Sequence, residues 1–241
     1  IEYGLLTDPD GRPVAVRVSP GNTADPTAFT TIATDVRTTF GLHDMVMVGD
    51  RGMITSARIE HLRELGGFGW VTALRAPAIA ALAADDGPLQ ISLFDEMDLA
   101  EITHPDYPGE RLIACRNPAL ATERARKRLA LLDATDSELA KITAAVTASR
   151  LVGAGAIGIR VGKTIGRYKM AKHYTLTITG DEFTYTRNQS AIDAEAHLDG
   201  VYIIRTTVPA TQMSPDKVVA TYKSLARVER DFRSMKSIDL D

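Results

Sequence analysis

Cysteine is almost absent from this 241-residue sequence, which contains Cys115 and no other. A single thiol excludes an internal disulfide framework and a cysteine-based zinc site, and it is typical of proteins of the reducing cytoplasm. Long hydrophobic runs are absent as well, since no apolar stretch approaches the roughly 18 residues of a membrane-spanning helix. The five histidines are scattered without the spacing of metal ligands. We therefore expect a cytoplasmic protein without a membrane span.

Charge is unevenly distributed along the chain. Residues 1–110 contain seven arginines, no lysine and 17 acidic residues, a net charge of −10. Residues 111–241 contain 21 basic and 14 acidic residues, a net charge of +7. This segregation favours an acidic centre beside a basic half that faces a polyanion, but chance and an ordinary solvated surface explain the same numbers.

Short apolar runs alternate with helix-type spacing in the first and last parts of the chain. Tyr3–Thr7 and Pro13–Val18 flank the turn sequence Asp8-Pro9-Asp10-Gly11 and predict a β-hairpin. Further strands are expected at 45–48, 70–74 and 201–206, and helices at 26–40 (with Asp25 as N-cap), at 56–65 and from Pro215 onward. Strands that alternate with helices predict an α/β fold.

The middle of the chain has a different pattern. An alanine-rich stretch that ends at Asp85-Asp86-Gly87-Pro88 predicts a linker. Residues 119–150 predict two charged helices, the second of which begins at a capping box formed by Thr135 and Glu138. Alternation around Gly180-Asp181 predicts another hairpin. The expected organisation is an α/β core that is interrupted by an inserted α+β module, with domains at 1–76, 77–200 and 201–241.

Glycines recur over residues 153–164. The first three have the GxGxxG spacing of a dinucleotide-binding loop, and Gly162-Lys163-Thr164 resembles the end of a phosphate-binding loop. The first motif must follow a strand and open a helix, which this segment does not predict. The second lacks its first glycine, because position 157 is isoleucine. We expect a structural loop here, with a nucleotide-binding enzyme as the less favoured alternative.

Two carboxylates are candidates for catalysis. Asp50 follows the apolar run 45–48, at the carboxyl end of an expected strand, where α/β sheets place their chemistry. An isolated aspartate is also a common turn former, so its role depends on a partner. The last expected helix offers one, because Tyr222, Glu229 and Lys236 are spaced by seven and share one face.

The same helix has an apolar side and a basic side. The apolar stripe, which should pack on the sheet, consists of Leu225, Val228, Phe232 and Met235. The basic fan consists of Lys223, Arg227, Arg230 and Arg233. Glu229 lies at the rim of the stripe, where we expect it to face the protein core rather than open solvent. A carboxylate at a buried edge beside such a fan suits a phosphodiester enzyme, in which the acid holds a divalent cation and the fan holds DNA. A solvated helix in which Glu229 pairs with Arg233 explains the same spacing.

The spacing Tyr222-x2-Leu225-x3-Glu229-x6-Lys236 resembles the Tyr-Arg-Glu-Lys signature of bacterial insertion-sequence DDE transposases. The surrounding string YKSLARVERDFRSMKSIDL is similar to the closing block of that family. Earlier segments resemble the blocks around its second catalytic aspartate: Gly4-Leu-Leu-Thr-Asp8, Gly11-Arg-Pro-Val14, Gly21-Asn-Thr-Ala-Asp25-Pro26 and Val48-Gly-Asp50-Arg51-Gly52-Met53. The segment 196–206 is similar to the block that leads back to the core.

This resemblance implies an RNase H-like core, a mixed sheet flanked by helices, that the inserted module interrupts. It implies a DNA transposase that cleaves transposon ends and joins them to target DNA with two Mg²⁺ (or Mn²⁺) ions. Asp50 would be the second metal-binding carboxylate and Glu229 the third, while Tyr222 and Lys236 would position DNA phosphates. The implied partners are the terminal inverted repeats, the target DNA at the nucleoid and a second subunit in a synaptic homodimer.

Two features depart from the family pattern. The family's first aspartate lies on a strand before the hairpin, whereas this chain begins at Ile1, so we expect a fragment that is inactive by itself. Asp8 matches the second strand, where we expect a turn role. Leu225 stands at the signature arginine, and Arg233, about 20° from Tyr222 around the helix, is the candidate substitute. A catalytically dead DNA-binding remnant is the alternative to an active transposase.

Basic residues alternate with aromatics in the expected module, at Arg167-Tyr168-Lys169 and Lys172-His173-Tyr174. This pattern suits phosphate contact and stacking on unpaired bases, and it makes Lys169 and Lys172 candidates for DNA binding. A strand edge protected by lysines is the rival interpretation.

Overall fold

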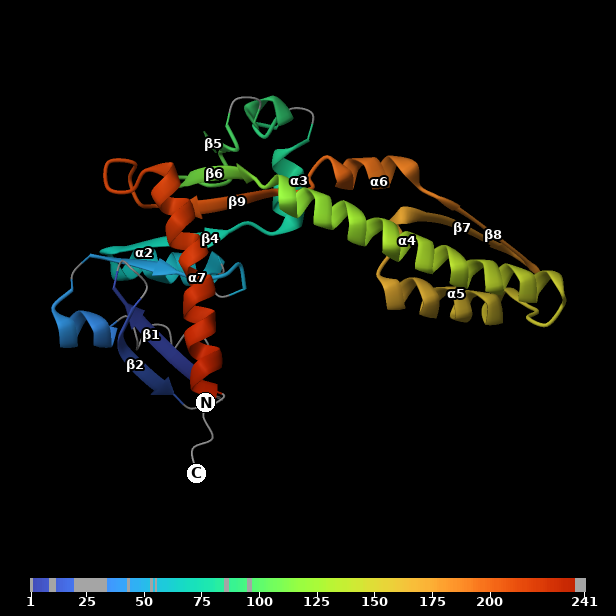
Figure 1. Ribbon diagram of the computed structural model, residues 1–241, viewed down its shortest axis with the longest axis horizontal. Helices are drawn as coiled ribbons and strands as arrows, with labels where there is room; N and C mark the ends of the chain where they lie inside the picture. Colours follow the sequence, from blue (N-terminus) through green and yellow to red (C-terminus); the bar gives the residue numbers. More distant parts are fainter. Residues whose placement is uncertain are drawn as a thin grey trace. The chain divides into compact units, whose positions relative to one another are not determined.

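The computed structural model describes residues 2–8, 12–19, 34–42, 44–52, 54, 56–84, 87–94 and 97–236. The chain forms two compact units (Figure 1): unit 1 comprises Ile1–Cys115 and Tyr202–Asp241, and unit 2 comprises Arg116–Val201. Residues 34–40 are helical, as predicted, but the expected cap of that helix at Asp25 lies outside the described residues.

Unit 1 is built on a five-stranded mixed sheet with the strand order β3-β4-β9-β6-β5. Its strands are β3 (Met45–Val48), β4 (Phe68–Ala73), β5 (Leu99–Ile102), β6 (Arg111–Arg116) and β9 (Val201–Thr206). β3 and β4 are parallel, whereas β4 with β9 and β5 with β6 are antiparallel. Because β9 pairs with β4, the chain returns to this sheet after unit 2, which confirms the return strand predicted at 201–206.

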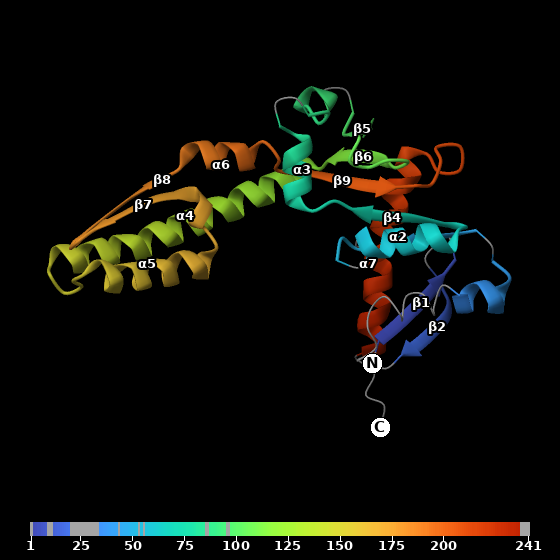
Figure 2. The same ribbon diagram turned by 180° about the vertical axis from the view of Figure 1, so that it is seen from behind.

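Helices cover both faces of the sheet, α2 (Ser56–Leu65) on one and α7 (Pro215–Lys236) on the other. Successive side chains of a strand point to opposite faces. Phe68 and Trp70 of β4 pack with the buried residues of α2, while Val71 packs with α7. This helix–sheet–helix arrangement confirms the predicted α/β class and is compatible with an RNase H-like core (Figure 2).

The predicted first hairpin is confirmed as a separate two-stranded sheet of β1 (Glu2–Thr7) and β2 (Pro13–Ser19). Asp8 follows β1 and has the turn role expected of it, since its Oδ1 accepts the N–H of Arg12 at 2.8 Å. The turn residues 9–11 lie outside the described residues.

The alanine-rich stretch predicted as a linker is instead the helix α3 (Ala76–Leu82), whose Ile79 and Leu82 are buried. Alanine has the highest helix propensity, and a proline in the first turn suits a helix start, so local preference explains the difference. A 3₁₀ helix, η1 (Ile91–Phe94), follows. The next strands, β5 and β6, belong to the five-stranded sheet, and unit 2 begins after Cys115.

Unit 2 has a hydrophobic core of its own, between helices and a two-stranded sheet. Its elements are α4 (Pro118–Thr147), α5 (Ala154–Tyr168), η2 (Ala171–His173), β7 (Tyr174–Thr179), β8 (Glu182–Arg187) and α6 (Gln189–Ala196). α5 runs beside α4 in both views (Figures 1 and 2), and the antiparallel pair β7–β8 confirms the second predicted hairpin.

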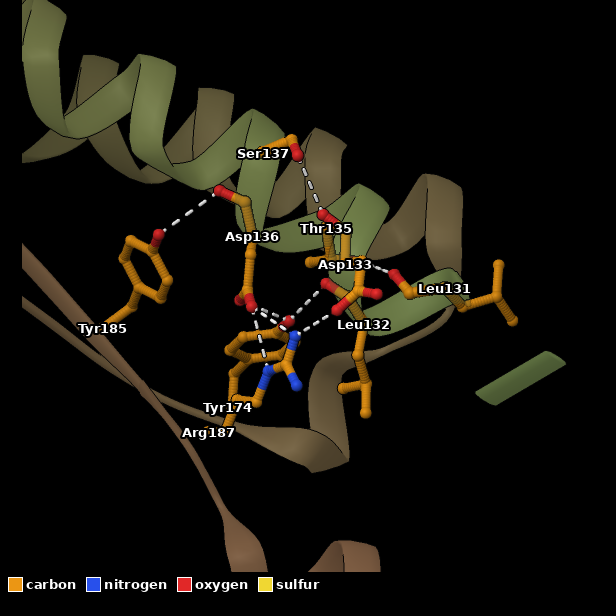
Figure 3. A network of polar contacts seen from close by, with 9 residues as sticks. All are labelled: Leu131, Leu132, Asp133, Thr135, Asp136, Ser137, Tyr174, Tyr185 and Arg187. Atoms are coloured by element: carbon orange, nitrogen blue, oxygen red, sulfur yellow. Dashed lines mark hydrogen bonds and ion pairs between the residues drawn. The ribbon is translucent and has the colours of Figure 1, made fainter. Parts of the chain in front are cut away.

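The predicted break between two helices at residues 133–136 is wrong, because α4 continues through it. Thr135 is fully buried inside the helix, and its hydroxyl donates to the carbonyl of Leu131 at 2.7 Å instead of capping a new helix. Asp136 faces the hairpin, where it accepts hydrogen bonds from Tyr174 and Arg187 (Figure 3). The polar residues that suggested a cap therefore serve tertiary contacts.

The loop predicted over the glycine-rich segment is also wrong, because residues 154–168 form α5. Its Ile157, Val161 and Ile165 are buried at helical spacing. A helix leaves no phosphate-cradling loop of backbone N–H groups, so the structure contradicts the nucleotide-binding alternative.

Candidate functional site

Asp50 lies in the turn that follows β3. This turn is tied to β4, since the N–H of Gly49 donates to the carbonyl of Val71 at 3.2 Å and Thr72 Oγ1 donates to the carbonyl of Asp50 at 3.1 Å. The Asp50 side chain is exposed, and its Oδ1 accepts the N–H of Gly52 at 2.8 Å. The turn-forming interaction is therefore present, and it holds the carboxylate at the carboxyl end of the strand.

Two residues that support this turn were not foreseen from the sequence. Thr72 is buried within β4, and Arg75, just beyond β4, donates from Nε and Nη2 to the carbonyl of Arg51 at 3.4 and 3.3 Å. A buried hydroxyl in an otherwise apolar strand requires a hydrogen-bond partner. Thr72 was therefore the feature of the sequence that could have indicated a supporting contact here. Its partner depends on the parallel pairing of β3 with β4, which the sequence did not reveal.

Glu229 lies on α7, which crosses the sheet and contacts β3 and β4. Val218 and Val219 of α7 belong to a buried cluster. Val48, the last residue of β3, and Tyr222 are both packed against that cluster. Glu229 lies about two helical turns beyond Tyr222. Its side chain is 64% exposed, so the expectation that it faces the protein core is wrong, and a polyanionic substrate has access to the carboxylate.

Tyr222 connects the two carboxylates electrostatically. Burial is the main reason that the pKa of Tyr222 is raised, and the charges of Asp50 and Glu229 raise it further while that of Arg51 lowers it. Charges act on a phenol in this way when they lie near it. Two carboxylates 179 positions apart in the sequence therefore act on the same phenol.

The pairing of Glu229 with Arg233, which the sequence left open, is present in the structure. Arg233 Nη2 lies 3.4 Å from Glu229 Oε2, and the Arg233 side chain is 78% exposed. An exposed i,i+4 ion pair is weak, of the order of 0.5 kcal/mol. The pair with Arg233 therefore competes very little with a cation that binds the Glu229 carboxylate more strongly.

The remaining residues of α7 divide much as the spacing predicted. Leu225, Val228 and Phe232 are half-buried, although the fully buried positions lie nearer the start of the helix. The basic fan is exposed at Lys223, Arg227, Arg230 and Arg233. Lys236 ends the helix, and its side chain and that of Met235 lie outside the described part of the chain.

Comparison with known families places the chain in a group of related proteins. Residues 4–241 match the family described as Transposase DDE domain. The chain belongs to this family. Searches of curated proteins and of solved structures each returned no match. Membership supports transposition as the function and DNA as the substrate of this transposase domain.

The donor chemistry of the transposase domain fits a divalent metal ion. Asp50 and Glu229 offer carboxylate oxygens, the ligands that Mg²⁺ prefers, and Mg²⁺ sites with one or two carboxylates are completed by water and substrate phosphates. Within the described residues there is no group of three or more His, Cys, Asp or Glu side chains placed to hold a metal. None of the helices described here combines the length and apolarity needed to cross a membrane.

The two lysine candidates in unit 2 of the transposase domain differ. Lys169 is exposed and ends α5 in the left-handed conformation, with φ of 55°. Lys172 forms an ion pair with Glu195. His173 and Tyr174 are buried, so the predicted stacking of these aromatics on unpaired bases is wrong. The rival strand-edge interpretation is wrong too, because both lysines lie outside β7 and β8.

Proposed function

We propose that this transposase domain takes part in metal-dependent cleavage of DNA at transposon ends and in strand transfer to target DNA. Asp50 and Glu229 are the second and third carboxylates of its metal site. The observation that carries the proposal is that α7, the helix of Glu229, packs against β3, the strand that ends just before Asp50. Membership in the transposase DDE domain family over residues 4–241 supports it.

Each residue of the site has a separate task in this proposal. The Asp50 carboxylate stays oriented by the Gly52 N–H, and Glu229 leaves its weak pair with Arg233 to become a ligand. Mg²⁺ or Mn²⁺, when bound, supplies the Lewis acidity that phosphodiester cleavage needs. Tyr222 and Lys236 position DNA phosphates beside the cut.

The same proposal covers the features that resemble the Tyr-Arg-Glu-Lys signature of insertion-sequence transposases. Arg233 takes the role of the signature arginine, which Leu225 lacks, and Arg227 and Arg230 contact the DNA backbone from the exposed side of α7. Unit 2 corresponds to a module inserted into an RNase H-like core. The working assembly is a synaptic homodimer on DNA at the nucleoid.

The test replaces each carboxylate by its amide. Asp50→Asn and Glu229→Gln are compared with Asp216→Asn, which changes an exposed carboxylate in the first turn of α7. Mn²⁺ binding to this chain is measured by electron paramagnetic resonance, and we expect at least a tenfold loss of affinity in the two site variants and none in the control. DNA cleavage is measured in the natural full-length protein.

In the full-length protein, either site variant should abolish Mg²⁺-dependent cleavage while it still binds the transposon end. Full cleavage by Asp50→Asn or Glu229→Gln refutes the role of that residue. End binding without cleavage by the unmodified protein identifies a DNA-binding remnant instead of an active transposase.

A further inference from the structure

The outer side of α5 carries a row of cations. The apolar side of this helix is buried in the core of unit 2, whereas Arg160, Lys163 and Arg167 are exposed. Spacings of three and four residues bring these three side chains onto one face, over about 10 Å of helix. We call them the α5 ridge. The helix from Ala154 to Tyr168 contains no acidic residue.

The α5 ridge is not neutralised by ion pairs. Across the described residues, no carboxylate lies within salt-bridge distance of Arg160, Lys163 or Arg167. Glu138 of α4 is influenced by two ridge cations at longer range: its pKa is lowered first by its hydrogen bond from Lys141 and then, more weakly, by Arg167 and Arg160. The cations of α4 differ, because Arg126 and Lys127 both pair with Glu123.

Three glycines occupy another side of α5. Gly155, Gly162 and Gly166 centre about 110° around the helix from the ridge, and a Cβ at each would meet nothing within 4 Å. Ile159, which is 77% exposed, lies between the two strips. The ridge is therefore defined by its three cations and not by the glycines.

We propose that the α5 ridge binds the sugar–phosphate backbone of duplex DNA. This inference rests on the proposed function, in that it gives the DNA substrate a second contact surface on unit 2. Three cations without paired acids complement a polyanion and release its counterions on binding. A second copy of the chain is the poorer occupant, because ridge against ridge would bring like charges together.

The chemistry of the ridge favours a duplex over unpaired bases. Binding of single strands without sequence preference uses exposed aromatic rings as stacking platforms. Tyr168, the aromatic residue of α5, is packed against the core of unit 2, and the Arg167 guanidinium lies 5.4 Å from its ring centroid. The ridge therefore offers charge but no stacking surface.

The experiment compares two double variants of the full chain. Lys163→Gln/Arg167→Gln removes two cations of the ridge, and Arg126→Gln/Lys127→Gln removes two exposed cations of α4 that are paired with Glu123. Binding to a random-sequence duplex is followed by fluorescence anisotropy at several salt concentrations. We expect at least a tenfold loss of affinity for the ridge variant and less than a twofold loss for the control. The slope of log K against log salt should fall by about 2 for the ridge variant, since each lost phosphate contact contributes about 0.9.

Any of the following outcomes overturns this inference: equal losses in both variants, no loss in the ridge variant, or a change in self-association without a change in DNA affinity. Stronger competition by single-stranded DNA than by duplex also overturns it. Failure of the proposed function gives a different result, because Asp50→Asn leaves the ridge intact and must bind the duplex like the unmodified chain whether or not the metal site exists.

Discussion

At the scale of single residues, Cys115 makes the free energy of unfolding of unit 1 depend on pH in the alkaline range. The thiol is 2% exposed in the cluster between the sheet and α7, and this burial raises the pKa of Cys115 to about 11. An unfolded thiol ionises near pH 8.5. Stability is therefore complete below about pH 8.5 and falls as the pH rises toward 11, because the unfolded chain loses the proton first. The expected loss is about 1 kcal/mol per pH unit.

The measurement is urea unfolding at pH 8, 9 and 10, followed by the fluorescence of Trp70. This is the single tryptophan of the chain, it is buried in unit 1, and so it reports that unit alone. Cys115→Ala serves as the control, and it should lack the alkaline loss whatever its stability at pH 8. Parallel pH profiles of the two proteins would show that the thiol does not titrate with unfolding.

The catalytic candidates illustrate what single residues reveal before a structure is known. The end of an apolar run predicted where Asp50 lies, and helical periodicity predicted that Tyr222 and Glu229 share a side of α7. Periodicity does not, however, predict how deeply each position of a helix is buried. It predicted a stripe at Leu225, Val228, Phe232 and Met235, whereas the buried positions nearest the sheet are Val218 and Val219.

At the scale of elements, a polar network fastens the β7–β8 hairpin to the middle of α4 (Figure 3). Asp136 accepts from the Tyr174 hydroxyl at 2.7 Å and from Arg187 Nε at 2.9 Å. Tyr174 is buried, and it also donates to the carbonyl of Leu132. We expect Asp136→Ala to lower the free energy of unfolding of unit 2 by about 2–3 kcal/mol, because hydrogen bonds to a charged acceptor are lost beside a buried hydroxyl.

Far-UV circular dichroism is the suitable probe, because α4 and α5 are long helices of unit 2 and contribute strongly to the helical signal. The control is Ser137→Ala, which removes an exposed hydroxyl that donates to the backbone of the same turn. It should change stability by less than about 0.5 kcal/mol. Similar losses in both variants would mean that disturbance of the helix, and not the Asp136 network, determines the effect.

The same network explains why the sequence misled at this element. Thr135 and Glu138 have the spacing of a capping box, and Asp133 and Asp136 are weak helix formers, so local preference indicated a break. Tertiary contacts outweigh it, because Asp133 and Asp136 both bind Arg187 of β8. In α5 the cause of the error is different. The glycines indicated a loop, although the spacing of the buried residues Ile157, Val161 and Ile165 is helical.

At the scale of the whole molecule, alternation of strands and helices was sufficient to predict the α/β core and the return of residues 201–206 to it. The edges of the middle segment were harder to derive, because β5 and β6 are short strands without a strong alternating pattern. They are defined by pairing with each other and by their place in the sheet. Unit 2 in the structure spans Arg116–Val201, a narrower range than the expected module at 77–200.

The internal contacts of unit 2 predict that it can be excised. The ends of the unit meet, because the N–H of Asn117 donates to the carbonyl of Gly200 at 3.0 Å. The cluster from Leu132 to Phe183 supplies a core without any residue of unit 1. We expect a fragment of residues 116–201 to be helical and to melt cooperatively, since a unit with its own core can fold alone. A second protein, in which a short Gly-Ser linker replaces residues 116–201, should keep the buried emission of Trp70.

The paired design separates the possible outcomes. A cooperative fragment together with a folded linker protein means that the sheet of unit 1 assembles from residues 1–115 and 202–241 without the intervening chain. A fragment that melts gradually, or a linker protein with exposed Trp70, means that the units stabilise each other. The second result would contradict the view that one segment is inserted into an otherwise self-sufficient core, and the functional assignments to unit 2 would then require the intact chain.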